Sequence, residues 1–391
     1  MINEKLKEHF AIVKKSSLFE QYYEDVQLIS EVLPIEKHTL RKTLSTKFKL
    51  EDELKGVYLV RSGGSSAKPL IFPVDIEENL YQRKLLAKEL VKFGMFSSKT
   101  IALNLFSYKD MYRTAAIVDD VLEKCNATTI SLGASSSFDL VFNSALQFKV
   151  NIVMGTPSKL VLFARYILDN KLSLFIKNVM YAGEFLLQSQ VILLKEAFGT
   201  KQIFSLYGSA ETGIWGWSNY SQSPMSFNIL DDIIVEIDSP DNDGNGVVVV
   251  TNLLRKRFPV FRYNMGDMGS LKQHGSKRVL TLKSRESKSF SVDAEAYFID
   301  DFEWLFEIVT RFQIQLYFNS ETQIDVKFLL IKMTTKESEI NKVYSFIKER
   351  LQQIFQVNPR KVNIIIAFVS ESDLYINSTT SKTPIIVDFR E

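Results

Sequence analysis

Cysteine and histidine are scarce in this chain of 391 residues, which contains one cysteine and three histidines. A single cysteine, Cys125, cannot form a disulfide within the chain and cannot build a cluster of thiolate ligands for a metal. The histidines His9, His38 and His274 stand far apart in the sequence, which argues against a metal site built from imidazoles. Cys125 falls at the expected end of a helix, so we interpret it as a packing residue rather than a nucleophile.

Excess charge and long apolar runs are also absent. The formal net charge is +2 at pH 7, which predicts no strong attraction to nucleic acid or to anionic lipid. No uninterrupted apolar run reaches the roughly 18 residues that a membrane-spanning helix needs. The N-terminus is charged from Glu4 onward, unlike a secretory leader. We therefore expect a cytoplasmic protein that binds neither nucleic acid nor a membrane.

Aromatic residues, by contrast, are abundant, and segments typical of strands and helices alternate along the chain. With 29 Phe and 15 Tyr, the binding pockets are expected to be lined by rings. From residue 77 to residue 206, short apolar segments alternate with amphipathic segments of roughly 10–15 residues, which predicts an α/β fold with a mainly parallel sheet. Ligands bind at the carboxyl ends of the strands in such sheets, so the clusters of small residues that follow the strands are the candidate sites.

The pattern changes after Phe227. Residues 233–237 and 247–251 are apolar and flank a polar turn, which predicts an antiparallel hairpin. Residues 283–291 are charged and rich in hydroxyl groups and are interpreted as a hinge, after which two strands, a helix and a further strand predict a small α+β domain. We therefore expect a large N-terminal domain over residues 1–284, with layered α/β sheets and a small β region, and a mobile small domain over residues 285–391.

A stretch rich in glycine and serine lies between two apolar runs and reads Arg61-Ser-Gly-Gly-Ser-Ser-Ala-Lys68-Pro. Glycine lets a ligand approach the main chain closely. Free backbone N–H groups and serine hydroxyls can hold a phosphate group, and the lysine adds a positive charge. The spacing of the Walker phosphate loop is absent. Taken alone, the stretch is explained equally well as a turn between two strands.

Four further motifs follow in a fixed order. They are Met154-Gly-Thr-Pro-Ser158; Tyr181-Ala-Gly-Glu184 with Tyr207-Gly-Ser-Ala-Glu211; Phe258-Pro-Val-Phe-Arg-Tyr-Asn-Met-Gly-Asp267; and Ser284-Arg285 with Thr379-Thr-Ser-Lys382 far downstream. Together with the glycine- and serine-rich stretch they cover nearly the whole chain. In this order they resemble the adenylate-forming ligase superfamily, and in particular its phenylacetate–CoA ligase branch.

The resemblance implies an enzyme that joins a carboxylate to the α-phosphate of ATP and then passes the acyl group to a thiol. Both reactants are anions, so bound Mg²⁺ and lysines must offset their repulsion. The resemblance implies that Lys68, Glu211 and Lys382 are catalytic, with Glu211 also the metal ligand. It implies nucleotide-binding roles for Gly64, Ser65, Ser66, Gly183, Glu184, Tyr207, Gly208, Ser209, Asp267 and Arg285.

The substrate and the acceptor are less closely specified. Tyr108 and Trp215 are expected to line the pocket of an aryl or other hydrophobic acid. The acceptor is expected to be coenzyme A or the phosphopantetheine of an acyl or aryl carrier protein, and a homodimer is considered as well. Ala210 replaces the usual hydroxyl residue before the metal ligand, and Ala294 and Ser287 also depart from the pattern. These departures leave two alternatives, which are adenylyl transfer without thioester formation and a non-catalytic nucleotide- or acyl-binding relative.

Overall fold

The computed structural model describes residues 2–16, 19, 23, 26, 29–47, 56–61, 70–186, 188–223, 225–274, 277–285, 289–292, 295–298, 302, 304–305, 308–320, 323–332, 337–355, 362–376 and 383–390. The chain divides into two compact units. The first comprises Met1–Gly63, Pro69–Leu186 and Leu193–Arg285, and the second comprises Gly64–Lys68, Leu187–Ile192 and Glu286–Glu391. Each unit is described by itself.

Within its described residues, the first unit contains one sheet of eleven strands in the order β10-β11-β12-β13-β9-β8-β7-β6-β5-β3-β4. Half of it is parallel: β3 (Ile101–Asn104), β4 (Thr128–Ser131), β5 (Ile152–Gly155), β6 (Asn178–Ala182) and β7 (Gln202–Ser209). The other half is antiparallel: β8 (Gly213–Asn219), β9 (Ser226–Ile229), β10 (Ile233–Asp238), β11 (Gly246–Asn252), β12 (Val260–His274) and β13 (Lys277–Arg285). The predicted α/β fold is therefore confirmed.

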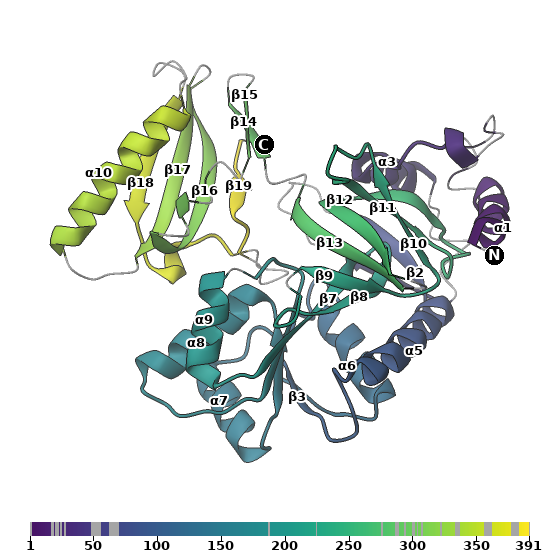
Figure 1. Ribbon diagram of the computed structural model, residues 1–391, viewed down its shortest axis with the longest axis horizontal. Coiled ribbons are helices and arrows are strands. Elements are labelled where there is room, and N and C mark those ends of the chain that lie inside the picture. Colours follow the sequence, from purple (N-terminus) through teal and green to yellow (C-terminus); the bar gives the residue numbers. More distant parts are fainter. Residues whose placement is uncertain are drawn as a thin grey trace. The chain divides into compact units, whose positions relative to one another are not determined.

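Helices cover both faces of the parallel half. They are α5 (Ile76–Phe93), α6 (Thr114–Lys124), α7 (Phe138–Gln147), α8 (Pro157–Asp169) and α9 (Gln188–Phe198). Figure 1 shows α5 and α6 on one side of these strands and α7 and α8 on the other. The start and end of α5 follow from its sequence: the Asp75 carboxylate accepts a hydrogen bond from Glu78 N at 3.0 Å, and Gly94 ends the helix at φ +78°.

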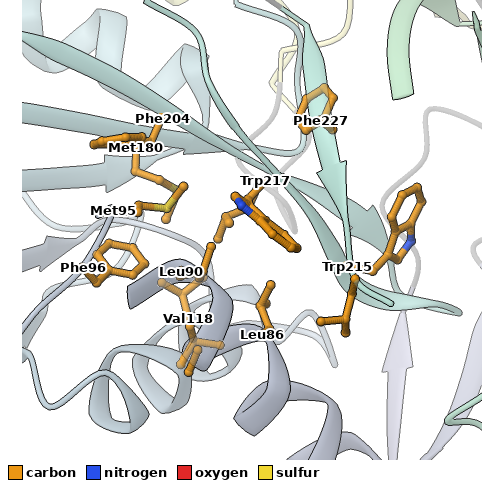
Figure 2. Packing of buried hydrophobic residues seen from close by; sticks show 14 of the residues in the cluster. Leu86, Leu90, Met95, Phe96, Val118, Met180, Phe204, Trp215, Trp217 and Phe227 are labelled. Carbon is orange, nitrogen blue, oxygen red and sulfur yellow. The ribbon is translucent and has the colours of Figure 1, made fainter. Parts of the chain in front are cut away.

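The core between α5, α6 and the sheet is built from alternate residues of the parallel strands. Met154, Met180 and Phe204 occupy equivalent places on β5, β6 and β7 and are almost fully buried, because side chains two apart in a strand share one face. Figure 2 shows the Trp217 ring of β8 in the same cluster, with Met180 and Phe204 on one side of it and Leu86 of α5 on another. This packing fixes α5 against the region where the parallel and antiparallel halves meet.

A second cluster joins the N-terminal segment to the antiparallel half of the sheet. It includes α1 (Ile2–Lys14), η1 (Ile29–Glu31), α3 (Lys37–Lys47), β1 (Val57–Arg61) and β2 (Ile71–Asp75). The Phe261 ring of β12 packs against Phe10 at 5.1 Å between centroids, and Ile35 N donates to Arg262 O at 2.7 Å. This packing holds β1 and β2 in place. The two strands precede and follow residues 62–69 in the sequence, the segment predicted to bind phosphate.

The second unit contains an α+β arrangement. Its strands β18 (Val362–Phe368), β17 (Gln323–Lys332), β16 (Val309–Ser320) and β19 (Ile386–Asp388) form one sheet in that order, packed by α10 (Glu337–Ile354). A separate hairpin pairs β14 (Ser289–Val292) with β15 (Glu295–Phe298), and η3 (Glu371–Asp373) follows β18. The core is aromatic, with Phe302, Phe328 and Phe355 in mutual contact.

Some elements differ from the sequence-based expectation. Trp215 was expected to line a pocket, but residues 213–219 form the central strand β8. The apolar residues 259–263 predict a short strand, whereas β12 continues to His274. The sequence predicts a helix over residues 112–124, but α6 begins at Thr114, because Lys109 and Tyr112 pair across a tight turn. No helix in the described ranges is long and apolar enough to cross a membrane.

Candidate functional site

Several predicted site residues cannot be placed. Gly64, Ser65, Ser66, Lys68 and Lys382 lie outside the described residues. Arg285 is the last residue of β13, and only its backbone is described. The structure therefore leaves the predicted phosphate loop and the predicted lysines as expectations.

Five of the predicted nucleotide residues gather at the carboxyl ends of β6 and β7, which are adjacent parallel strands. They are Gly183 and Glu184 after β6, and Tyr207, Gly208 and Ser209 at the end of β7. A Cβ atom on Gly208 would lie 2.0 Å from Gly213 O, so only glycine allows the chain to fold back into β8 at this point.

Tyr207 and Asp267 are joined directly. The Tyr207 hydroxyl donates to Asp267 Oδ2 at 2.6 Å, and Asp267 on β12 is only 2% exposed. The Tyr207 ring also packs edge-on against Trp215, with 4.9 Å between the ring centroids. The structure thus brings together a predicted ring-stacking residue and a predicted ribose-binding carboxylate.

The two predicted pocket residues differ in exposure. Trp215 is 0% exposed, and its Nε1 donates to Thr212 Oγ1 at 3.0 Å, so in this structure the ring supports Tyr207 from inside the core and presents no surface to a ligand. Tyr108 is 62% exposed and lies beside Arg113. Only Tyr108 is therefore positioned to touch a ligand without movement.

Glu211 is a buried carboxylate with an unused oxygen. It is 2% exposed, and its Oε1 has no hydrogen-bond partner in the described part of the chain. Its side chain is hydrogen-bonded to Tyr263, and burial first and Glu211 second raise the pKa of the Tyr263 hydroxyl well above its ordinary value. A buried carboxylate oxygen is costly unless a donor or a cation satisfies it. Glu211 could therefore hold a divalent cation.

A buried polar network holds the peptide that follows Glu211. The Thr212 carbonyl accepts hydrogen bonds from Gln82 Nε2 at 3.0 Å and from Asn252 Nδ2 at 2.8 Å. Arg255, also buried, donates from Nη2 to Asn79 Oδ1 at 2.7 Å. Helix α5 and the end of β11 thus fix the turn that carries Glu211. We did not predict these residues from the sequence, although polar side chains at 252 and 255 directly after an apolar strand are unusual enough to suggest a buried role.

Glu184 has a structural contact. Its Oε2 accepts hydrogen bonds from Ser158 N at 2.9 Å and from Ser158 Oγ at 2.6 Å. Thr156 caps the same helix by accepting from Lys159 N at 3.3 Å. A carboxylate is favoured at a helix N-terminus because the exposed N–H groups there are positive. The two motifs at residues 154–158 and 181–184 therefore meet at the start of α8.

Among the residues that the structure describes, no group of three or more His, Cys, Asp or Glu side chains could form a metal site by itself. A cation at Glu211 would therefore need further ligands that this set of side chains does not provide. Phosphate oxygens and water are the other ligands that Mg²⁺ accepts readily.

Comparisons with known proteins give the following relatives. None of the known protein-family models matches the chain. Indoleacetate–lysine synthetase of Pseudomonas savastanoi is 32% identical over 171 residues, which is 43% of this chain and 42% of that protein. The match thus spans less than half the length of this curated relative.

Solved structures match over more of the chain. A 2-hydroxyisobutyryl-CoA ligase in the postadenylation state, bound to an adenylate, has a TM-score of 0.77 at 14% identity and covers 99% of this chain and 88% of its own. The anthranilate CoA ligase AuaEII with anthranoyl-AMP has a TM-score of 0.56 at 15% identity, covering 82% and 64%. ATP-bound MatB from Rhodopseudomonas palustris has a TM-score of 0.56 at 12% identity, covering 83% and 66%.

At identities this low the solved structures show the fold alone. The chain has the fold of the 2-hydroxyisobutyryl-CoA ligase and of the anthranilate CoA ligase, both of which are bound to adenylates. The adenylate-forming ligase fold expected from the sequence is therefore confirmed.

Proposed function

We propose that this protein is an ATP-dependent ligase that activates a carboxylic acid as an acyl-adenylate and passes the acyl group to a thiol. The observation that carries the proposal is the buried Glu211 carboxylate with one unsatisfied oxygen, located four residues after the Tyr207 that binds Asp267. A nucleotide ribose and a cation–phosphate group would thus be recognised by the same short segment. The 2-hydroxyisobutyryl-CoA ligase neighbours, which contain an adenylate with and without coenzyme A, support the same order of events.

Each residue is assigned a role that its chemistry allows. The Asp267 carboxylate would accept hydrogen bonds from the ribose hydroxyls. Tyr207 holds this carboxylate and offers its ring to the base. Glu211 would hold Mg²⁺, which offsets the negative charge of the phosphates when bound. Lys68 and Lys382 would supply the remaining positive charge.

The thiol acceptor would be coenzyme A or the phosphopantetheine of a carrier protein. Within this proposal the chain works as an adenylation domain over residues 1–284 and a mobile small domain over residues 285–391, located in the cytoplasm and related to the phenylacetate–CoA ligase branch. The acid is aryl or hydrophobic and meets Tyr108. A carrier protein and a second copy of the chain are the proposed macromolecular partners.

A second candidate replaces the thiol with an amine. The name indoleacetate–lysine synthetase describes an enzyme that joins an acid to an amino acid. This curated relative is detected by its sequence identity and not only by its fold. An acyl-adenylate reacts with either nucleophile by the same displacement of AMP. The activation step is therefore common to both candidates, and the acceptor distinguishes them.

The test is ATP–pyrophosphate exchange with a panel of aryl and aliphatic acids, comparing wild type with Glu211→Gln and Lys382→Ala. We expect exchange that depends on the acid and on Mg²⁺, and that falls at least a hundredfold in both variants. Glu196→Gln, which changes an exposed glutamate of α9, is the matched control and should behave as wild type. No exchange with any acid, in protein that binds ATP, would exclude the ligase and favour a binding role.

Product analysis then identifies the acceptor. Acyl-CoA, acylated carrier protein or an N-acyl amino acid would each be detected by mass spectrometry. Release of AMP with a thioester supports the main proposal, and release of AMP with an amide supports the second candidate. An adenylylated product that retains AMP would contradict both.

A further inference from the structure

Arg113 is a half-buried arginine whose guanidinium packs against two tyrosine rings. It directly precedes α6, and its guanidinium carbon lies 4.6 Å from the ring centroid of Tyr58 and 5.5 Å from that of Tyr108. Its Nη1 lies 3.4 Å from the Tyr108 hydroxyl, at the outer limit of a hydrogen bond, and its buried Nε has no partner. Among the residues that the structure describes, no carboxylate forms an ion pair with it.

Two further arginines lie near Tyr58, which packs against Arg113. The Tyr58 hydroxyl lies in the field of Arg83, Arg113 and Arg255. Arg83 is paired with Asp120 at 3.1 Å, and the charge of Arg255 is offset in part by Glu78 and Asp75. Arg113 has no such carboxylate among the described residues, and a cation in a partly buried place attracts an anion more strongly than it would in water.

The position of Arg113 is fixed by a tight turn that is hydrogen-bonded to the end of β1. Lys109 and Tyr112 exchange backbone hydrogen bonds of 3.0 and 2.7 Å, and the two residues between them, Asp110 and Met111, have φ of 49° and 63°. Non-glycine residues adopt this conformation only when the surroundings enforce it. Met111 O accepts a hydrogen bond from Arg61 N at 3.2 Å, which ties the turn to the last residue of β1.

This turn follows β3 at the carboxyl edge of the parallel strands, the same edge at which Tyr207 lies near the end of β7. Tyr108 is 62% exposed and Met111 43%, so a ligand can reach the turn from solvent. The place therefore combines two ring walls, access from solvent and a guanidinium that no described carboxylate pairs with.

We propose that Arg113 binds a second carboxylate of the reacting molecules, one that is not activated by ATP. Tyr58 and Tyr108 form the walls of this site. A guanidinium fork matches a carboxylate in geometry, and one such cation balances one monoanion. The inference rests on the proposed function. Two molecules could bring this carboxylate, namely an acid substrate with a second carboxyl group or an amino-acid acceptor, whose α-carboxylate remains free after its amine is acylated.

Direct titration tests the site without requiring turnover. The full chain is titrated calorimetrically with aliphatic and aromatic dicarboxylates beside their half-amides, and with the free amino acids beside their amides. We expect at least one free acid to bind tenfold or more tightly than its amide, and Arg113→Gln to lose that difference. Arg113→Lys, which keeps the charge but loses the planar fork, should retain part of it.

A matched control is available in the second unit, where the Arg350 guanidinium lies 4.7 Å from the ring centroid of Trp304. Arg350→Gln removes a comparable cation–ring contact and should leave binding unchanged. The proposal would be overturned if the wild-type protein bound none of these carboxylates more tightly than the amides. It would also be overturned if Arg113→Gln bound them as well as wild type.

Exchange and transfer rates then separate the two sources of the carboxylate. If Arg113→Gln raises the KM for the acid tenfold in pyrophosphate exchange, the carboxylate belongs to the acid substrate. If exchange is unchanged but condensation with an amino acid slows tenfold, it belongs to the acceptor. Effects on neither would overturn the inference. Carboxylate binding in a protein that catalyses no exchange with any acid would instead contradict the proposed function and support the site.

Discussion

The Tyr207 hydroxyl donates a hydrogen bond of 2.6 Å to Oδ2 of Asp267, although the two residues are 60 positions apart in the sequence. Strand β7 carries the first residue and β12 the second, and three other strands lie between them in the sheet. Trp215 and Phe227 pack against the Tyr207 ring and hold it in position. The hydrogen bond therefore orients the buried carboxylate that we propose binds the ribose.

Tyr207→Phe tests this preorganisation. The variant keeps the ring but removes the donor to a buried carboxylate, so we expect a loss of roughly 1–3 kcal/mol in the free energy of unfolding. Because Asp267 would no longer be held, the KM for ATP in pyrophosphate exchange should rise about tenfold. The control is Tyr220→Phe, which removes the hydroxyl of a tyrosine whose ring packs against Tyr181. An unchanged KM would show that the pair is not used in nucleotide binding.

The second prediction concerns Gly213, which combines a positive φ with close packing. Its φ is +71°, and a Cβ atom there would lie 2.7 Å from Gln82 Nε2 and 2.9 Å from Arg255 Nη2. We expect Gly213→Ala to displace both side chains and to lower the free energy of unfolding by about 2–4 kcal/mol. Gly244 has a similar φ of +77° with nothing within 4 Å, so Gly244→Ala measures the backbone cost alone. Equal losses in urea denaturation would contradict the packing argument.

The network beneath Glu211 gives a prediction about the cation. Asn252→Ala removes the 2.8 Å hydrogen bond to the Thr212 carbonyl and loosens the turn that carries Glu211. We expect a higher Mg²⁺ concentration for half-maximal exchange, with a smaller change in the KM for the acid. The control Asn228→Ala removes a comparable bond, from Nδ2 to Trp217 O at 3.3 Å, away from Glu211. A shift in Mg²⁺ dependence in both variants would indicate general destabilisation.

His9 predicts a pH dependence of stability. Burial first, and the charge of Lys256 second, lower the pKa of His9 from 6.5 to about 4. Between these values the unfolded chain binds the proton and the folded chain does not, so stability is complete above pH 6.5 and falls as the pH drops toward 4. The loss should be on the order of 3 kcal/mol.

His9→Phe should flatten this part of the curve, measured as the free energy of unfolding in urea from pH 7 to pH 4. The ring of the new residue can pack against Phe261, which the imidazole already contacts at 6.2 Å between centroids. The wild-type slope should exceed the slope of the variant throughout this window. Identical slopes would show that His9 does not carry the acid sensitivity.

Local patterns in the sequence determined a large part of the fold. Alternating apolar segments specified the parallel strands and the helices that cover them, because each element must bury one face. The polar turn at residues 239–246 specified the hairpin of β10 and β11. The order of the motifs indicated the superfamily, because each motif is a short segment whose chemistry can be recognised without its neighbours.

Only the tertiary structure decided which distant residues meet. The sequence placed Trp215 in the substrate pocket, whereas the structure buries it completely beneath Tyr207. Asn252 and Gln82 are 170 positions apart, yet they share the Thr212 carbonyl. Arg113 contacts two tyrosine rings and has no acidic partner within the described residues, an arrangement that depends on two segments far apart in the sequence. Periodicity and local composition act over a few residues, whereas hydrogen-bond partners and burial depend on packing between segments that the sequence alone does not align.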